Sequence, residues 1–416
     1  MDKTIRSAES IEVVIKVAER CNINCSYCYV FNKGNTAYLQ KPVKISRDMM
    51  VATTNYVVDG AKALGSTTVA VVFHGGEPLM MGKRDFDFFC KTLHEALDSV
   101  TDLRLNLQTN AMLIDDEWID LFAKHSISVG VSIDGPKHVH DAERKDFRNR
   151  GTYDRTLVGL RSLQVAAREG KIPWPGIICV INATANGSEV YRHFIDDLGV
   201  KSMTLHLPMD THETFRGQDP MPYAQFVCDA FDEWLKDADP EVDVRMFGQM
   251  LGFFQGRVVS TTDNPSHLSL QHVTIESDGA IDVDELKPTR FIGESFNVKT
   301  SSMIEFANST TSRYIRDVYA SLADECMPCV WRNYCRGGLQ HGVQVNRWSD
   351  ARGFNNVSVL CDGLQKIYSH VAHHMLRAGF SEDGILKVMD HGNRQFNPAS
   401  AVNLLVDGSG NLHATA

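Results

Sequence analysis

Three cysteines stand within eight residues near the N-terminus, in the segment Cys21-Asn22-Ile23-Asn24-Cys25-Ser26-Tyr27-Cys28. The CxxxCxxC spacing puts three thiolates on one loop, and a curled loop can hold three corners of a cubic iron–sulfur cluster. Such a cluster usually takes four thiolates, and the nearest other cysteine, Cys90, stands in a helical pattern. The fourth iron would then stay open for a substrate or cofactor. A structural zinc site, which prefers a closed set of four ligands, and chance proximity are the alternative interpretations.

A second group of cysteines lies near the C-terminus. It comprises Cys326, Cys329, Cys335 and Cys361. Four thiolates can complete a closed iron–sulfur cluster or a zinc site, and spacing alone does not separate the two. The other three cysteines lie in apolar patterns, where cysteine packs as a small hydrophobe, so we expect them in the core. These are Cys90, Cys179 and Cys228.

Polar groups follow three predicted strands. The segments are His74-Gly75-Gly76-Glu77-Pro78, Gln108-Thr109-Asn110 and Ser132-Ile133-Asp134-Gly135-Pro136. Gly75 and Gly76 would let the backbone approach a ligand closely, and Glu77 can accept hydrogen bonds from an ammonium group. The polar side chains of the other two segments could bind a ribose or a substrate, although they are also ordinary turn residues. These are Gln108, Asn110, Ser132 and Asp134.

Strand-like and helical segments alternate from Ile11 to about Ala238 and would position these groups. The predicted strands are Ile11–Val17, Thr67–Phe73, Leu103–Gln108, Ile127–Ile133, Gly176–Ile181 and Met203–Leu207. The predicted helices are Ser46–Leu64, Arg84–Asp98, Asp115–Lys124, Tyr153–Arg168, Ser188–Asp197 and Tyr223–Lys236. Strands that are apolar on both faces are typical of a buried parallel sheet. Six such units predict an α/β domain, either doubly wound or a partial barrel, with the functional groups at the strand ends.

The pattern changes after Asp239. A helical stretch, Arg245–Phe254, leads to a polar joint at 260–266, where we place a candidate boundary. Leu268–Glu276 and Ala280–Val283 read as a β-hairpin around an Asp-Gly turn. Another helix is expected at Gly363–Ala378, after the second cysteine group. The last 40 or so residues mix polar and apolar character and receive no assignment.

The composition is that of an ordinary globular protein, with 416 residues, 43% hydrophobic and 23% charged. The net charge of -10 and the absence of a polybasic block give no support to binding of nucleic acid or a membrane surface. The polar start of the sequence resembles no secretion signal, and the apolar runs are too short to span a bilayer. We therefore expect a soluble, cytoplasmic protein without nucleic-acid or membrane partners.

The cysteine loop and the strand-end motifs together resemble the radical S-adenosylmethionine (SAM) superfamily. The resemblance implies a partial (β/α)6 TIM barrel whose open iron is chelated by SAM, with a 5′-deoxyadenosyl radical formed by reductive cleavage. Cys21, Cys25 and Cys28 would then hold a [4Fe–4S] cluster, and Tyr27 would lie near the adenine. The segment Gly75–Glu77 resembles the family's GGE motif, which binds the SAM amino group.

The likeness extends beyond these motifs to peptide-modifying members of the superfamily. The QTN and SxDGP elements, the segment 140–144 and the segment Gly151-Thr152-Tyr153 resemble theirs. Arg144 would pair with the SAM carboxylate, since a guanidinium suits bidentate carboxylate binding. Taken without the family, Arg144 is equally a solvated residue in a charged run.

The segment Cys326–Gly338 resembles the SPASM extension of radical SAM maturases, which normally has seven cysteines and two auxiliary [4Fe–4S] clusters. In that family a cysteine follows the hairpin glycine by five residues, and another follows the Cys-x-Gly-Gly element; here these positions are Asp284 and Leu339. No cysteine lies between Cys228 and Cys326. We infer a single auxiliary cluster, held by the four cysteines of the second group.

The resemblance also implies a domain plan and a proton acceptor. Residues 1–240 would form the radical SAM core, 241–265 a bridging helix and linker, and 266–378 a SPASM-like domain, with a C-terminal extension of unknown role at 379–416. In related maturases an acidic residue beside the lost hairpin cysteine takes a proton from the substrate. Asp284 or Glu285 would be this general base, although solvated acidic residues on a hairpin are commoner.

Three segments resemble the Xye/Grr/Fxs group of maturases, which form three-residue cyclophanes in ribosomally made peptides. They are Val14–Glu19, Tyr29–Gly34, and Ser277–Gly279 followed by Asp284–Lys287. The implied mechanism removes a hydrogen from a β-carbon, and the carbon radical attacks an aromatic ring two residues earlier. Loss of an electron, to the auxiliary cluster, and of a proton restores aromaticity. The implied partners are a precursor peptide with a leader and a flavodoxin- or ferredoxin-type reductant.

Two other functions stay open from the sequence. One is a different radical SAM modification, such as formylglycine formation in a sulfatase, a thioether crosslink or an epimerisation. The other belongs to another class, a non-catalytic iron–sulfur protein that senses redox state.

Overall fold

The computed structural model describes residues 5–34, 36–254, 273–283, 294–342, 344–391, 403–406 and 412–415. Contacts within the chain group them into two compact units. The first unit comprises Met1–Ile133, His140–Gly176 and Asn264–Asp317, and the second comprises Asp134–Val139, Ile177–Asp263 and Val318–Ala416. The domain limits given above are defined by motifs rather than by contacts, and they remain a prediction.

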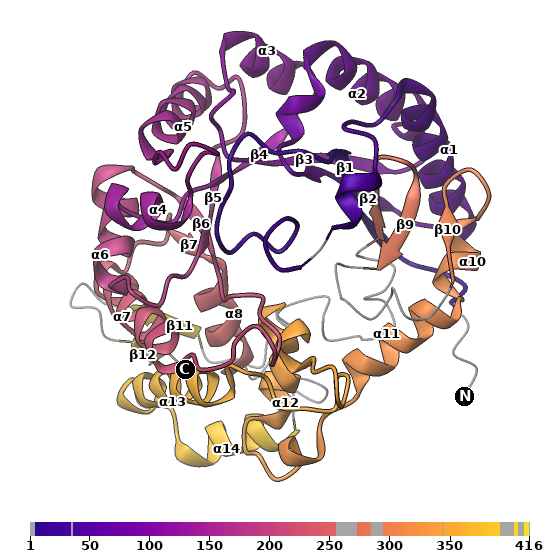
Figure 1. Ribbon diagram of the computed structural model, residues 1–416. Coiled ribbons are helices and arrows are strands. Elements are labelled where there is room, and N and C mark those ends of the chain that lie inside the picture. Colours follow the sequence, from indigo (N-terminus) through magenta and orange to yellow (C-terminus); the bar gives the residue numbers. More distant parts are fainter. Residues whose placement is uncertain are drawn as a thin grey trace. The chain divides into compact units, whose positions relative to one another are not determined.

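Four parallel strands in the order β1-β2-β3-β4 organise the first unit (Figure 1). They are β1 (Ser10–Ala18), β2 (Thr68–Gly75), β3 (Asp102–Thr109) and β4 (Ser128–Ser132). Their helices are α1 (Arg47–Leu64), α2 (Lys83–Leu97), α3 (Asp116–Lys124) and α5 (Tyr153–Arg168). The strands and helices predicted for this region are confirmed, with ends that differ by one or two residues.

The capping residues explain why these helices begin where they do. The Ser46 hydroxyl accepts a hydrogen bond from the Met49 amide at the start of α1, and the Asp115 carboxylate accepts one from Trp118 at the start of α3. Helix α1 ends at Gly65, whose φ of 65° is the left-handed conformation that glycine adopts readily.

The predicted hairpin is present and extends the sheet of the first unit. Strand β8 (Val273–Ile275) pairs parallel to β1, and β9 (Ala280–Val283) returns antiparallel to β8. The turn ends at Gly279, with a φ of 80°, which confirms the Asp-Gly turn. Strand β10 (Phe296–Asn297) adds to β9. The part of the hairpin prediction that covers 268–272 lies outside the described residues.

The second unit contains β5 (Gly176–Val180), β6 (Ser202–His206) and β7 (Asp243–Val244), which are parallel in that order. Helix α6 (Gly187–Arg192) continues as a π-helical turn to Asp197. Three longer helices follow, and their predictions are confirmed. They are α7 (Met221–Asp237), α8 (Arg245–Phe254) and α13 (Cys361–Arg377).

Several elements were not predicted. They are α4 (Lys137–Glu143), α10 (Met303–Ala307), α11 (Thr310–Ala320), α12 (Arg332–Cys335), α14 (Glu382–His391), β11 (Asn403–Val406) and β12 (Leu412–Thr415). The last three lie in the C-terminal stretch that received no assignment.

Parallel strands that alternate with helices make this an α/β protein, as predicted. The three cysteines expected in the core, Cys90, Cys179 and Cys228, are at most 3% exposed, which confirms that expectation. Among the described residues, no helix combines the length and hydrophobicity that a bilayer crossing requires.

Candidate active site

The cysteine loop leaves the end of β1 and is held in shape by the chain after α4. The Asn24 amide donates to the Lys145 carbonyl at 2.7 Å, and the Ser26 amide donates to the Glu143 carbonyl at 3.2 Å. The side chain of Asn32 donates to the Cys25 carbonyl at 2.7 Å. These bonds curl the loop, as the sequence interpretation requires for three thiols to converge.

The three thiols of the loop lie close enough to influence one another. Burial raises the pKa of the Cys21 thiol to about 12, the Glu77 carboxylate adds to the rise, and the Ile23 N–H opposes it. Charges at Cys25 and Cys28 raise this pKa further. Metal binding would therefore displace protons from the thiols, because thiolate is the ligand form.

The side-chain amides of Asn110 and Asn22 lie beside the Cys21 thiol. The Asn110 side chain donates to Cys21 Sγ at 3.9 Å and to Asn22 Oδ1 at 2.7 Å. The Nδ2 of Asn22 is buried and has no hydrogen-bond partner among the described residues. Hydrogen bonds to sulfur tune iron–sulfur clusters, so three thiols with the Asn110 amide beside Cys21 suit such a cluster.

Gly75, the last residue of β2, and Gly76 lie against the backbone that leads into Cys21, and their predicted approach to a ligand remains a prediction. A Cβ on Gly75 would lie 2.2 Å from the Ala18 carbonyl oxygen, and a Cβ on Gly76 would lie 2.3 Å from the Arg20 carbonyl oxygen. The Gly76 amide also donates to Ala18 at 2.8 Å. The glycines thus let the end of β2 pack directly on the chain that leads into Cys21.

Glu77 is 1% exposed and joins the ends of two strands. Its Oε1 accepts from the Thr109 hydroxyl at 2.7 Å and the Leu79 amide at 3.1 Å, and its Oε2 accepts from the Asn110 amide at 2.9 Å. Burial raises its pKa to about 7, although these hydrogen bonds oppose the rise. A ligand ammonium beside it would favour the ionised form.

The other residues predicted to contact SAM or the substrate make hydrogen bonds or ring contacts within their own units. In the first unit, the Gln108 amide donates to the Ser132 hydroxyl at 2.7 Å. The Arg144 guanidinium, 6% exposed as a residue, lies over the Tyr27 ring at 5.4 Å from its centre. In the second unit, Asp134 accepts a hydrogen bond from the Val180 amide at 3.0 Å. Arg144 is thus no solvated residue, contrary to the alternative interpretation.

A buried charged cluster in the first unit was missed from the sequence. Lys16 on β1 is 4% exposed and pairs with Glu276 at 3.0 Å, while Glu19 accepts from the Ser277 amide at 3.1 Å. Burial and the nearby Glu276 raise the pKa of Glu19 to about 7, and burial and Lys16 lower that of His74 to about 4. The available signal was Lys16, a lysine between two apolar residues of a predicted strand.

In the second unit the fold brings the four C-terminal cysteines together. The Cys329 amide donates a hydrogen bond to the Cys326 carbonyl at 3.1 Å, which closes the CxxC turn. Cys335 is the last residue of α12. Cys361, the first residue of α13, is near enough to Cys326 and Cys329 for their charges to raise its pKa, after the larger effect of burial. Burial likewise raises the pKa of Cys335 to about 11, and Cys361 and Cys326 contribute to the rise.

Arg347 supports this cysteine group, and no sequence pattern indicates its role. It is 1% exposed and donates to four backbone carbonyls at 3.0–3.3 Å. These carbonyls belong to Val318, Ser321, Phe354 and Asn356. Its charge lowers the pKa of Cys326 against the larger effect of burial. The buried Arg347 guanidinium thus holds the surrounding loops together by hydrogen bonds and favours the thiolate form of Cys326.

Asp284 and Glu285, the predicted general bases, lie outside the described residues. The chain leads into them from β9, whose register with β8 is described. Their role remains a prediction.

Comparison with known proteins finds a family match for the part of the chain that carries the first site. Residues 15–176, which include the cysteine loop and the ends of β2, β3 and β4, match the model of the Radical SAM superfamily. A serine-type anaerobic sulfatase-maturating enzyme of Bacteroides thetaiotaomicron is 24% identical over 97% of both chains.

Two solved structures share the fold. Native anSMEcpe with bound AdoMet and Kp18Cys peptide has a TM-score of 0.72 at 20% identity, covering 88% of this chain and 98% of that one. SuiB of Streptococcus suis has a TM-score of 0.53 at 15% identity, covering 85% of this chain and 77% of that one. The α/β fold is therefore the radical SAM fold with an additional C-terminal region. Residues 15–176 thus carry the Radical SAM match, and the chain is an enzyme similar to sulfatase-maturating enzymes.

Proposed function

We propose that this enzyme modifies a ribosomally made precursor peptide by joining an aromatic ring carbon to the β-carbon of the residue two positions later. The observation that carries the proposal is the division of its cysteines. Three occupy a loop with no fourth thiol, and four converge in the second unit without a cysteine between Cys228 and Cys326. That division suits one SAM-binding cluster and one auxiliary cluster, the set expected for the cyclophane-forming group.

The residues of the first unit would bind and orient the cofactor. Cys21, Cys25 and Cys28 would hold the first [4Fe–4S] cluster, Glu77 would accept the SAM ammonium, and Arg144 would pair with the carboxylate. The bound SAM and cluster supply a hydrogen-abstracting 5′-deoxyadenosyl radical, fed by a flavodoxin- or ferredoxin-type reductant. Tyr27, under the Arg144 guanidinium, would lie beside the adenine.

The remaining predicted contacts would complete the SAM and substrate surface, at the ends of strands as in other parallel α/β folds. These are Gly75, Gly76, Gln108, Asn110, Ser132 and Asp134. The auxiliary [4Fe–4S] cluster would be held by Cys326, Cys329, Cys335 and Cys361 and would accept one electron from the substrate. Asp284 or Glu285 would accept the accompanying proton, which restores the aromatic ring.

A second candidate function is formylglycine formation in a sulfatase. It is supported by the sulfatase-maturating relative that matches over 97% of both chains, and by the anSMEcpe structure with a bound peptide. Both candidates treat a peptide or protein as the substrate.

Co-expression with candidate peptides tests the two functions. Crosslinking removes two hydrogens from the peptide, but oxidation of a serine to an aldehyde removes two as well, so mass alone does not decide. We expect fragments that stay joined between the aromatic residue and its partner, and no reaction with an aldehyde-trapping hydrazide. A trapped aldehyde without linked fragments would replace the crosslinking proposal with formylglycine formation.

A further inference from the structure

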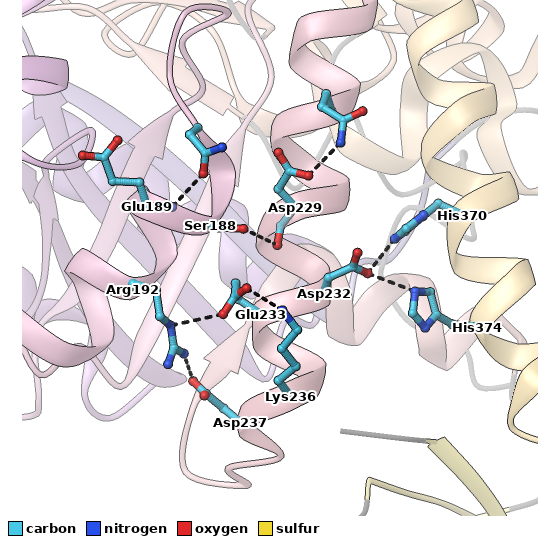
Figure 2. A network of polar contacts seen from close by, with 12 residues as sticks. Ser188, Glu189, Arg192, Asp229, Asp232, Glu233, Lys236, Asp237, His370 and His374 are labelled. Carbon is cyan, nitrogen blue, oxygen red and sulfur yellow. Dashed lines mark hydrogen bonds and ion pairs between the residues drawn. The ribbon is translucent and has the colours of Figure 1, made fainter. Parts of the chain in front are cut away.

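A group of two imidazoles and one carboxylate lies between α7 and α13 in the second unit, outside the cysteine sites (Figure 2). Asp232 Oδ1 lies 2.7 Å from His370 Nε2 and 2.9 Å from His374 Nε2. The three donor atoms all lie within 4.8 Å of one another. His370 and His374 are four residues apart on α13, so both project from one face of that helix.

The charges on α7 leave Asp232 without a basic partner of its own. Figure 2 shows that Glu233 pairs with Lys236 and Asp237 with Arg192, whereas Asp229 meets a neutral amide. Among the described residues, the side-chain hydrogen-bond partners of Asp232 are the two imidazoles. One carboxylate oxygen that faces two imidazole nitrogens is a donor set that a divalent cation can bind.

The supporting packing holds the three groups in place. The Phe231 ring meets the rings of His370 and His374 edge-on, with centres 6.1 and 5.6 Å away. Helix α13 begins close to α7, because a Cβ on Gly363 would lie 2.8 Å from the Pro220 carbonyl oxygen. A site carried by two closely packed helices is already organised before an ion arrives.

The donor types favour zinc over harder cations. Imidazole nitrogen suits zinc and its neighbours in the first transition row, whereas calcium and magnesium prefer all-oxygen sites. Tetrahedral zinc would hold neighbouring donor atoms about 3.4 Å apart, so Asp232 would withdraw by roughly 0.5–0.7 Å from the two imidazoles. The three side chains are 23–37% exposed, which leaves solvent access for a water as fourth ligand.

We propose that Asp232, His370 and His374 form a binding site for a zinc-like divalent cation that fastens α13 to α7. The consequence for the second unit follows from the position of Cys361 at the first residue of α13. His370 lies nine positions after Cys361, about 14 Å along a helix. A cation at the triad would therefore stabilise the helix that carries one of the auxiliary cysteines. The proposal does not depend on the reaction proposed above.

Zinc titration of the full-length enzyme with both iron–sulfur sites reconstituted tests the proposal. Bound zinc and iron are counted together after gel filtration, so that zinc in place of iron at the cysteines is recognised, and affinity is measured by calorimetry. We expect one zinc per chain in the wild type. His370→Gln and His374→Gln keep a side-chain N–H that can reach Asp232 but remove a good zinc ligand. We expect each to weaken binding about 100-fold or more, because loss of a residue that only supports a metal ligand already costs about 10- to 100-fold.

Matched controls lie on the same two helices. His373→Gln and Asp229→Asn should leave zinc affinity unchanged, because neither residue belongs to the triad. Zinc should raise the thermal unfolding midpoint of the wild type and of both controls, and should not raise it in the two triad variants. The proposal is overturned if the wild type binds no zinc with its iron sites filled, or if the triad variants bind it as tightly. Either result would leave the triad as a hydrogen-bonded clamp.

Discussion

At the scale of single residues, buried charged groups decide how the two cysteine sites are built. Beside the first site, Glu77 accepts hydrogen bonds that join the ends of β2 and β3. Beside the second site, Arg347 donates hydrogen bonds to four backbone carbonyls. Each is at most 1% exposed. A buried polar group that loses its partners costs more free energy than an exposed one, so these residues should be sensitive to substitution.

Arg347→Met should lower the free energy of unfolding by about 3 kcal/mol or more, because four buried carbonyls lose their donor. Urea unfolding and the iron content of purified protein measure the effect, and both should fall. Arg352→Gln is the matched control, since the Arg352–Glu325 ion pair is about half exposed on both sides and should contribute less than about 1 kcal/mol. Equal stability in the two variants would contradict the role given to Arg347.

Glu77 should make the SAM-free protein less stable as the pH rises from about 4.5 to about 7. Its pKa is 4.5 in the unfolded chain and about 7 in the fold, so the folded state binds more protons in this interval and stability falls. Glu77→Gln should therefore flatten the plot of unfolding midpoint against pH. The slope should shrink rather than vanish, because Glu19 shifts in the same direction. An unchanged slope would show that Glu77 is ionised throughout.

At the scale of elements, the sequence predicted most of what positions the site. Apolar strands, capping residues such as Ser46 and the Asp-Gly turn are local signals, and the structure confirms the elements that they indicated. Residues that act through distant contacts gave no such signal. Arg347 and the triad partners Asp232 and His370 are ordinary polar residues until the fold brings their elements together.

The close packing of Gly75 and Gly76 on the neighbouring backbone is likewise a contact between elements. The sequence predicts a close approach of the backbone to a ligand at Gly75 and Gly76, and the structure adds a close approach to backbone atoms of Ala18 and Arg20. The pairing of the ends of β1 and β2 is a long-range contact that no local pattern contains.

Gly76→Ala should destabilise the protein by about 3 kcal/mol, because the new Cβ would lie 2.3 Å from a backbone oxygen that cannot move alone. Iron bound at the first site should fall with it. Gly248→Ala, at an exposed and uncrowded position of α8, is the control and should stabilise the helix by about 0.5–1 kcal/mol. Thermal unfolding and iron analysis compare the two variants. A Gly76→Ala protein with normal stability and iron would contradict the close approach.

At the scale of the whole molecule, seven of the ten cysteines fall into the two groups proposed to hold clusters, and three pack in the core. Two [4Fe–4S] clusters predict about eight iron atoms per chain. Cys361→Ser should reduce iron to about four per chain and abolish the linked product, while 5′-deoxyadenosine still forms. Cys228→Ala, a change at a buried core cysteine, should keep the full iron content. Loss of iron in Cys228→Ala alone would contradict the division.

The most direct test of the central claim, that this chain is a radical SAM peptide maturase, is an anaerobic reaction with SAM, a strong reductant and a candidate peptide. The wild type should release 5′-deoxyadenosine and a peptide with linked fragments, and Cys25→Ala should release neither. Contradiction would come from a fully iron-loaded wild type that forms no 5′-deoxyadenosine, or from a Cys25→Ala variant that still cleaves SAM.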